Sequence, residues 1–132
     1  MERQVLAQYR RFWTKTYPAL FAAPASDRRR VLSPVVAEML LSQLLRNAQT
    51  LDRKGQKVTG TPVLLRQAVR GSGANAVVYG CLDMSGVVIV DKKSGKTVQR
   101  GRPRGAALTY MKRQSDGGWR AYGVDHAKRS RC

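Results

Sequence analysis

The first 22 residues place large apolar side chains three or four positions apart, with basic side chains between them. This spacing predicts an amphipathic helix over residues 3–22. Pro18 lies in its last turns, where a proline kinks or ends a helix because it has no backbone N–H. The aromatic members of the stripe either fill a core or line a cavity, and a core is the commoner role. The stripe consists of Val5, Leu6, Tyr9, Phe12, Trp13, Thr16, Tyr17 and Leu20.

Two more helices are predicted before residue 55. Asp27 is a good N-cap for a short helix over residues 27–32, because its carboxylate accepts hydrogen bonds from free backbone N–H groups. Ser33 and Pro34 then predict the start of a third helix over residues 34–53, with serine as the cap and proline at the first helical position. Its predicted apolar face consists of Val35, Val36, Met39, Leu40, Leu44, Leu45 and Leu51.

The hydrophobic period shortens from 3.6 to 2 residues near Val58, which predicts strands from there on. The strongest strand is rich in β-branched and aromatic residues and follows a Gly-Ser-Gly turn. Pro62 restricts the first strand to a sheet edge or a bulge. Helices followed by strands predict an α+β domain, with three N-terminal helices packed on one strongly curved antiparallel sheet of four to six strands. The predicted strands span residues 58–69, 77–83, 87–91, 97–99, 106–113 and 119–124.

Composition adds the strongest functional signal, which is charge. The chain has 132 residues, the size of one domain, and its hydrophobic fraction of 42% is enough for a core. Lys and Arg exceed Asp and Glu by 17, and the tail over residues 127–132 is polar and basic. Such a charge attracts phosphates, anionic lipids or acidic polymers, although a solvated basic surface is an equally ordinary role. The sequence has no apolar run of about 18 residues, the length that a membrane-spanning helix needs.

Two basic runs are the best candidates for binding a polyanion, because planar guanidinium groups match phosphate oxygens. Aromatic residues that would stack on bases are not interleaved with them, and no nucleic-acid-binding motif is present. Polyanion binding is therefore predicted to depend on charge rather than on base sequence. The candidate residues are Arg28, Arg29, Arg30, Arg100, Arg102, Arg104, Lys128, Arg129 and Arg131.

Several segments together resemble a known superfamily. They are the opening helix with Tyr9-Arg10-Arg11-Phe12-Trp13, the later leucine-rich helix and the closing hairpin around Asp116-Gly117-Gly118-Trp119. This order of elements is similar to the nuclear transport factor 2-like superfamily, over most of residues 5–126. The segments Gly60-Thr61-Pro62 and Val78-Tyr79-Gly80-Cys81-Leu82-Asp83, with the C-terminal cysteine, resemble small envelope-associated actinobacterial members. The resemblance implies a cone-shaped α+β fold, with helices against a curved sheet.

The same superfamily includes ketosteroid isomerase, scytalone dehydratase and polyketide cyclases, so the resemblance also raises the question of catalysis. Those enzymes need an acid or base inside an apolar cone, where burial tunes its pKa. Asp83 and Asp125 fall at strand ends, where a solvated or capping carboxylate is the ordinary role, and no catalytic residue is predicted. His126 with two cysteines cannot supply four ligands for a structural zinc, so neither metal nor cofactor is expected. The candidate pocket-lining residues are Tyr9, Trp13, Tyr17, Tyr79, Tyr110 and Tyr122.

The two cysteines are predicted to form a disulfide. Cys132 ends a basic tail that would fray unless it were held. Cys81 lies in the strongest predicted strand, and the last strand can bring the tail alongside it. The resembling envelope proteins place cysteines at corresponding points. Two unrelated buried thiols are the alternative, and they would be the default in a reducing cytosol. A disulfide favours an extracytoplasmic location, secreted or envelope-associated, over a cytoplasmic one.

Three functional hypotheses follow. The first is a non-catalytic binding or assembly module at the cell envelope, such as an accessory component of a secretion or conjugation apparatus, with a protein partner or a homodimer formed through the sheet. The second is a nucleic-acid or polyanion binder that relies on charge. The third is a small-molecule isomerase, dehydratase or cyclase of the cone type. A shallow, blocked cone favours the first, a positive groove the second, and a closed pocket with a buried Asp or Tyr the third.

Overall fold

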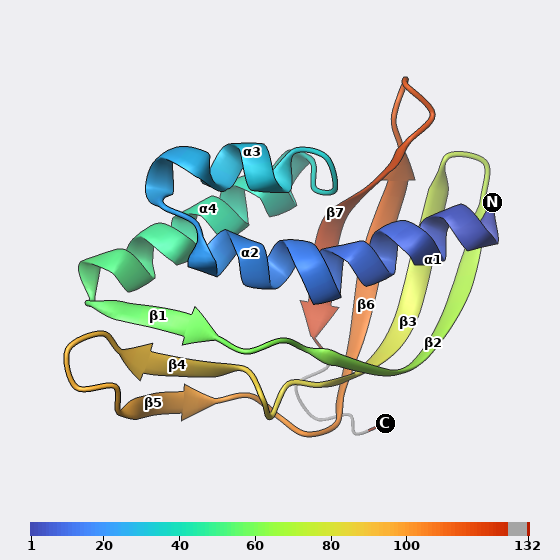
Figure 1. Cartoon of the computed structure of the whole chain (residues 1–132). Helices are drawn as coiled ribbons and strands as arrows, with labels where there is room; N and C mark the ends of the chain where they lie inside the picture. The colour runs from blue at the N-terminus through green and yellow to red at the C-terminus, as the bar shows by residue number, and fades with distance from the viewer. Residues whose placement is uncertain (127–131) are drawn as a thin grey trace.

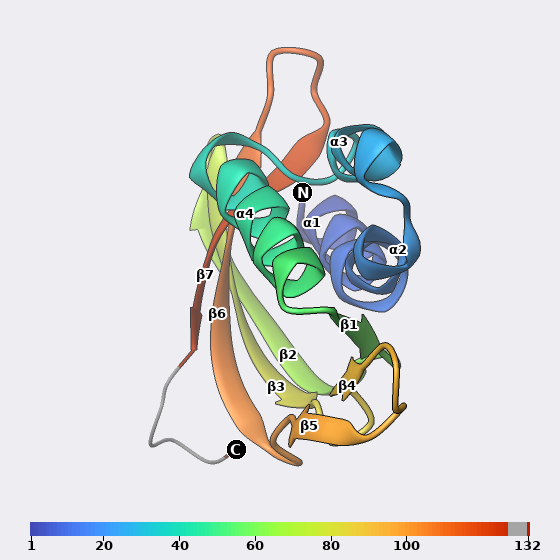
Figure 2. The ribbon, with the colours of Figure 1, turned by 90° about the vertical axis from the view of Figure 1, so that its left-hand side faces the viewer.

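The computed structural model describes residues 1–126 and residue 132. Helices cover the concave side of a strongly bent antiparallel structure made of a four-stranded and a three-stranded sheet (Figures 1 and 2). The long strands of the larger sheet curve around the helices, and the smaller sheet continues from their lower end, so that the whole has the shape of a cone. The predicted α+β class with N-terminal helices on a curved antiparallel sheet is confirmed.

The predicted opening helix is present, but it changes its winding partway along. It consists of α1 (Glu2–Arg11), a π-helical turn η1 (Phe12–Thr16) and α2 (Tyr17–Ala22). In the wide turn the Tyr17 N–H donates to the carbonyl of Phe12, five residues earlier. Pro18 follows at once and supplies no N–H to the preceding turn, so the sequence gives a physical reason for a local change of winding here.

The third predicted helix starts later than expected. A short turn η2 (Ala25–Asp27) leads into α3 (Arg28–Leu32), and α4 covers Glu38–Arg53, so Ser33 and Pro34 do not open it. Residues 35–37 instead run beside the last strand. The N–H of Ala121 donates to the Val35 carbonyl at 2.8 Å, and the Ala37 N–H donates to the Ala121 carbonyl at 2.9 Å. Pairing with a strand that is distant in sequence therefore wins over the local cap signal.

The strands of the two sheets have these bounds: β1 Gln56–Thr59, β2 Val63–Ser72, β3 Asn75–Asp83, β4 Val88–Asp91, β5 Thr97–Arg100, β6 Gly105–Arg113 and β7 Trp119–His126. The order is β2-β3-β6-β7 in the larger sheet and β1-β4-β5 in the smaller, and neighbouring strands in both run antiparallel.

One predicted strand is in fact two. The segment from residue 58 to 69 divides at Gly60-Thr61-Pro62, with β1 in the smaller sheet and β2 in the larger. Gly60 has a φ of 93°, which side chains other than glycine rarely adopt, and Pro62 cannot donate to a ladder. The chain therefore changes sheets at this point, and the described part has seven strands rather than four to six.

The core lies between the first helix, α4 and the concave face of the larger sheet. Trp13, Leu40, Leu44, Val78 and Trp119 are buried in this core. Leu108 is only partly buried, because alternation along β6 turns it to the convex side of the sheet. Met39, predicted on the apolar face of the third helix, is 83% exposed, since the helix turns Leu40, Leu44 and Ala48 inward instead.

Truncation of Leu44 to alanine is expected to lower the free energy of unfolding by about 2 to 5 kcal/mol, because it leaves a cavity between α4 and the sheet. Denaturant unfolding followed by circular dichroism measures this. Leu65→Ala is the matched control, since Leu65 is 43% exposed and its loss should change stability by about 0.5 kcal/mol or less. Equal stabilities for Leu44→Ala and the unmodified protein would remove Leu44 from the core.

Candidate functional site

The interior of the cone is largely filled by the aromatic stripe. Tyr9 and Trp13 are buried, and the Trp13 Nε1–H donates to the Thr109 hydroxyl on β6 at 3.2 Å. Tyr9 lies against Gly80 of β3, where a side chain would collide with the phenol oxygen. Burial raises the pKa of Tyr9 to about 12, so the phenol stays protonated. These two predicted pocket residues therefore belong mainly to the core.

A small cavity of about 180 Å³ remains inside the cone, between the first helix, α4 and β7. Its described lining contains no Asp or Glu. Burial raises the pKa of the Tyr17 phenol and lowers that of His126, whose imidazole lies 6.2 Å from the Trp13 ring. The cavity can bind an apolar group, with neutral hydrogen-bonding side chains around it. It is lined by Phe12, Trp13, Tyr17, Phe21, Leu40, Gln43, Leu44, Asn47, Val124 and His126.

The two carboxylates considered for catalysis are engaged in local hydrogen bonds. Asp83 accepts from the backbone N–H and the hydroxyl of Ser85, at 2.9 and 2.6 Å, and these bonds hold its pKa below the ordinary value. Asp125 accepts from the Tyr110 hydroxyl at 2.8 Å, which raises the pKa of that phenol. Neither carboxylate is among the residues that line the interior cavity. Both have the capping or surface role that their strand-end positions predict.

Three tyrosines lie together on the convex side of the larger sheet. Strand alternation turns Tyr79 of β3, Tyr110 of β6 and Tyr122 of β7 away from the helices. The rings of Tyr110 and Tyr122 are 6.1 Å apart, and Tyr79 is close enough to Tyr110 to affect its pKa. These three candidate pocket-lining residues therefore lie outside the cone interior, because β3, β6 and β7 turn them to the opposite face, where Tyr79 lines a groove.

Basic residues border the three tyrosines. Arg66 and Arg70 of β2 pair with Cys81 and Val77 of β3, which puts them on the same face of the sheet. The Lys112 ammonium lies 5.9 Å above the Tyr122 ring. We call this surface the outer sheet face; it consists of Arg66, Arg70, Tyr79, Tyr110, Lys112 and Tyr122. Sequence reasoning missed its three basic members, although the alternation Arg66-Gln67-Ala68-Val69-Arg70 already puts both arginines on one side of a strand.

The predicted polyanion-binding residues do not form one surface. Only 8% of the surface of Arg28 is exposed, and its guanidinium forms an ion pair with Asp52. Arg28 is therefore not part of an exposed cluster with Arg29 and Arg30, contrary to the prediction. Arg30 forms an ion pair with Asp27, while Arg29 is exposed. Arg100 donates to the carbonyl of Ser85, and Arg102 lies in the loop between β5 and β6. Lys128, Arg129 and Arg131 lie outside the described residues.

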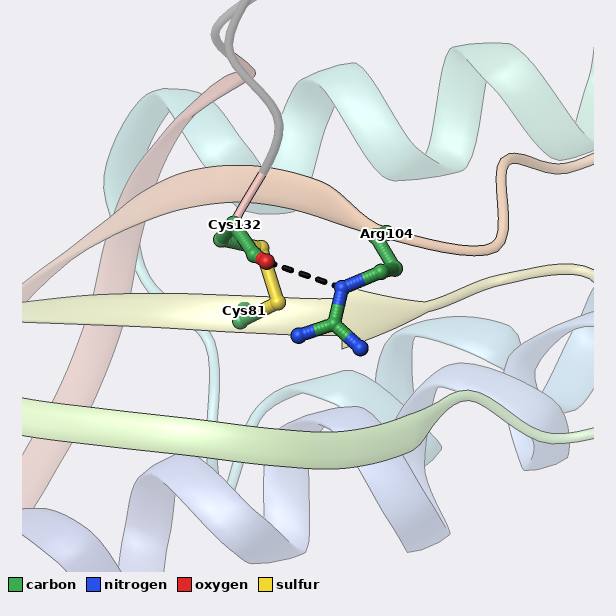
Figure 3. The surroundings of a disulfide bond; sticks show 3 residues. All are labelled: Cys81, Arg104 and Cys132. Carbon is green, nitrogen blue, oxygen red and sulfur yellow. Dashed lines mark hydrogen bonds between the residues drawn. A yellow bond between two sulfur atoms is a disulfide. The ribbon is translucent and has the colours of Figure 1, made fainter.

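The predicted disulfide between Cys81 and Cys132 is present (Figure 3). The two Cα atoms are 5.6 Å apart, within the range that a disulfide requires. Arg104 strengthens the attachment, because its Nε–H donates to the Cys132 carbonyl at 2.8 Å. The bond joins the C-terminal residue to the centre of the larger sheet, beside a shallow groove of about 430 Å³ that Tyr79 also lines.

Comparisons with known proteins give structural likeness without a close relative. No protein-family model and no curated protein sequence matches this chain. Among solved structures, the intermembrane space region of the chloroplast protein ARC6 is similar at a TM-score of 0.66, with 18% identity over 94% of both chains. A protein from Catenulispora acidiphila has a TM-score of 0.54 and 11% identity, over 97% of this chain and 92% of that one.

The chain has the cone-shaped nuclear transport factor 2-like fold. A Catenulispora acidiphila structure in complex with S-DNPA has a TM-score of 0.54 and 11% identity, over 97% of this chain and 94% of that one. At these identities the likeness shows the fold alone. The fold resemblance read from the sequence is therefore confirmed, while the activity has to come from the surfaces described above.

The unreduced, denatured protein should contain no free thiol, because both cysteines are in the disulfide. Thiol titration before and after reduction measures this. The bond spans 51 residues, so reduction is expected to lower the free energy of unfolding by about 4 kcal/mol in the chain-entropy model. The double variant Cys81→Ser, Cys132→Ser is the control, since reducing agent should not change its stability. Two reactive thiols without reduction would contradict the bond.

Proposed function

We propose that this protein is a non-catalytic binding module that acts outside the cytoplasm and docks a protein partner on its outer sheet face. The observation that carries the proposal is the row Tyr79, Tyr110 and Tyr122, bordered by cations on a side of the sheet that no helix of the described residues covers (Figure 2). Tyrosine and arginine are enriched at protein interfaces, because a ring buries a large area while its hydroxyl keeps a hydrogen bond. The most exposed of the three, Tyr79, has 49% of its surface accessible to solvent.

The contents of the cone support a binding role more than a catalytic one. A cone-type isomerase needs a carboxylate or a phenol aimed at its substrate inside an apolar pocket. Here Tyr9, Phe12 and Trp13 occupy most of the described interior, and the cavity beside Tyr17, of about 180 Å³, is smaller than the roughly 300 to 1,000 Å³ of small-molecule sites. The fold itself does not choose, because it serves both binding proteins and enzymes.

The disulfide supports a location outside the cytoplasm. Structural disulfides persist in oxidising compartments and are rare where thiols are kept reduced. Among the described residues, no helix is long and apolar enough to cross a membrane. A module of an envelope assembly, such as a secretion or conjugation apparatus, fits these properties, and a second copy of the chain is the other protein that the outer sheet face would take.

Site-specific photocrosslinking tests the docking surface. With p-benzoylphenylalanine in place of Tyr79 or Tyr110, irradiation of the cells that produce the protein should give one discrete adduct from both positions. Met39 is the matched control, since it is 83% exposed on α4, away from the sheet. An adduct of twice the mass of the chain would identify the partner as a second copy. Adducts of equal yield from Met39, or none from the outer sheet face, would overturn the proposal.

The net charge of +17 favours polyanion binding as a second function. Retention on heparin at about 50 mM salt should be clear and should fall steeply with added salt, because bound counterions are released. Replacing Arg66 and Arg70 together by glutamine should weaken retention and lower the salt dependence by about two counterions, roughly one for each contact. The control pair is Arg46→Gln with Arg53→Gln on α4, which removes the same charge. Equal losses from both pairs would assign retention to net charge alone.

A further inference from the structure

A second and larger cavity lies apart from both the cone interior and the outer sheet face. Its volume is about 910 Å³, and it lies where the end of α2, the loop into α3, the C-terminal half of α4 and β1 come together. Figure 1 shows these elements meeting at one end of the molecule. One part of the wall is apolar and consists of Pro18, Phe21, Ala22, Ala48, Leu51 and Val58.

The rest of the wall has an excess of positive charge. Arg28, Lys57 and Lys92 line it, and Asp52 is its one acidic lining residue among those described. Arg28 forms a two-pronged ion pair with Asp52, with Nη1 to Oδ2 at 2.7 Å and Nη2 to Oδ1 at 3.0 Å. The Lys92 ammonium lies 3.6 Å from the Asp52 Oδ1. One carboxylate therefore balances one of three cations.

Asp52 serves as the counter-charge of the buried Arg28. It lies in the last turn of α4, where the helix dipole disfavours negative charge. The Arg28 guanidinium nevertheless holds the pKa of Asp52 below its ordinary value by hydrogen bonding, so Asp52 remains ionised at neutral pH. Because a buried guanidinium needs a counter-charge, Asp52 is committed to Arg28. Lys57 has no ion pair among the described residues, and Lys92 shares the one Asp52 carboxylate with Arg28 at 3.6 Å, so the wall keeps a net positive charge for something that enters the cavity.

The wall also offers hydrogen-bond donors. β1 is an edge strand of the order β1-β4-β5, so its backbone groups on the side away from β4 are not used by the sheet. Thr59 and Thr61, each with a hydroxyl, are also lining residues of this cavity. Arg28 Nε is buried and has no hydrogen-bond partner in the described structure. The donor capacity of this wall therefore exceeds what the protein itself accepts.

We propose that this cavity binds a small amphipathic anion, with its apolar body against Phe21, Leu51 and Val58 and its anionic head against Lys57 and Lys92. An open cavity of this size, with one apolar wall and a few charged groups on the other, has the size and the mixed lining of a small-molecule site. The head is a carboxylate or a phosphate monoester, which both present oxygens to ammonium groups. The site is independent of docking at the outer sheet face.

Titration of the full chain with decanoate, followed by ¹H–¹⁵N correlation spectra, tests the proposal. Shifts are expected for residues 21–28, 51–52 and 56–61, which line or adjoin the cavity. Decan-1-ol lacks the charge and acetate lacks the apolar body, so each should bind at least about tenfold more weakly, a difference of about 1.4 kcal/mol. Decyl phosphate, compared with decanoate, shows which head group binds better.

Two variants locate the binding. The double variant Lys57→Gln, Lys92→Gln should bind decanoate about tenfold more weakly and should bind decan-1-ol with unchanged affinity. The control pair Lys54→Gln, Lys96→Gln removes the same charge from exposed positions outside the lining and should have little effect. Ala22→Trp adds an indole to the exposed lip of the cavity and should weaken decanoate and decan-1-ol alike, whereas Ala7→Trp on an exposed position of α1 should not.

Three results would overturn the proposal. The first is the absence of shifts with decanoate. The second is shifts confined to the groove beside Tyr79 and Cys81, which would assign the binding to the outer sheet face. The third is equal weakening by the two lysine pairs, which would assign it to net charge. In each case the photocrosslinking pattern on the outer sheet face would be unaffected, so the two proposals fail separately.

Discussion

The structure depends on the packing of one aromatic stripe against the concave side of the larger sheet. Trp13 is held by packing and by its hydrogen bond to Thr109, and Tyr9 reaches β3 only because Gly80 has no side chain. Removing a buried aromatic side chain of this kind typically costs about 3 to 5 kcal/mol. Since the stripe fills most of the interior, the same packing that stabilises the fold leaves a cavity of only about 180 Å³ between the first helix, α4 and β7.

The outer sheet face and the cavity at β1 both lie outside the packed interior. The strand β3 divides the roles, because its alternate side chains face opposite ways: Val78 and Leu82 join the core, while Tyr79 and Cys81 face outward. The disulfide anchors Cys132 on the outward side, beside the proposed docking surface. Cys81 of the disulfide and Tyr79 of the docking surface both lie on β3, so breaking the disulfide would disturb the surface next to it.

The positive charges of this protein do not form one continuous surface. Some of the cations have partners within the protein. Asp52 neutralises the buried Arg28, and Arg104 donates a hydrogen bond to the Cys132 carbonyl. Of the other cations, Arg66, Arg70 and Lys112 lie on the outer sheet face and Lys57 and Lys92 line the cavity at β1, while further ones such as Arg29 and Arg46 are exposed elsewhere. Each of these two sites has its own apolar surroundings, three tyrosine rings in one case and aliphatic and aromatic walls around Phe21 in the other. This pairing of charge with apolar surface distinguishes the two sites from a uniformly basic surface.

The sequence by itself determined the fold class, the first helix, the strongest strand and the closing hairpin. These rest on local periodicity and turn residues, which act within a few positions along the chain. The order of elements also carried the resemblance to the cone fold, and the two cysteines carried the disulfide. Its predictions went wrong where a distant partner competes with a local signal. Residues 35–37 pair with β7 instead of starting a helix at Ser33, and the chain changes sheets at Gly60.

The candidate sites were decided mainly by the tertiary structure. Which side of a strand faces the helices depends on register, so Tyr79, Tyr110 and Tyr122 moved from a predicted pocket to the outer sheet face, where Arg66 and Arg70 joined them. Arg28 looked like one of three exposed arginines, but Asp52, 24 residues later, removes it from the surface. The cavity at β1 has no sequence signature at all, because Phe21, Leu51, Lys57 and Lys92 come from separate elements that meet only when the helices pack against the sheets.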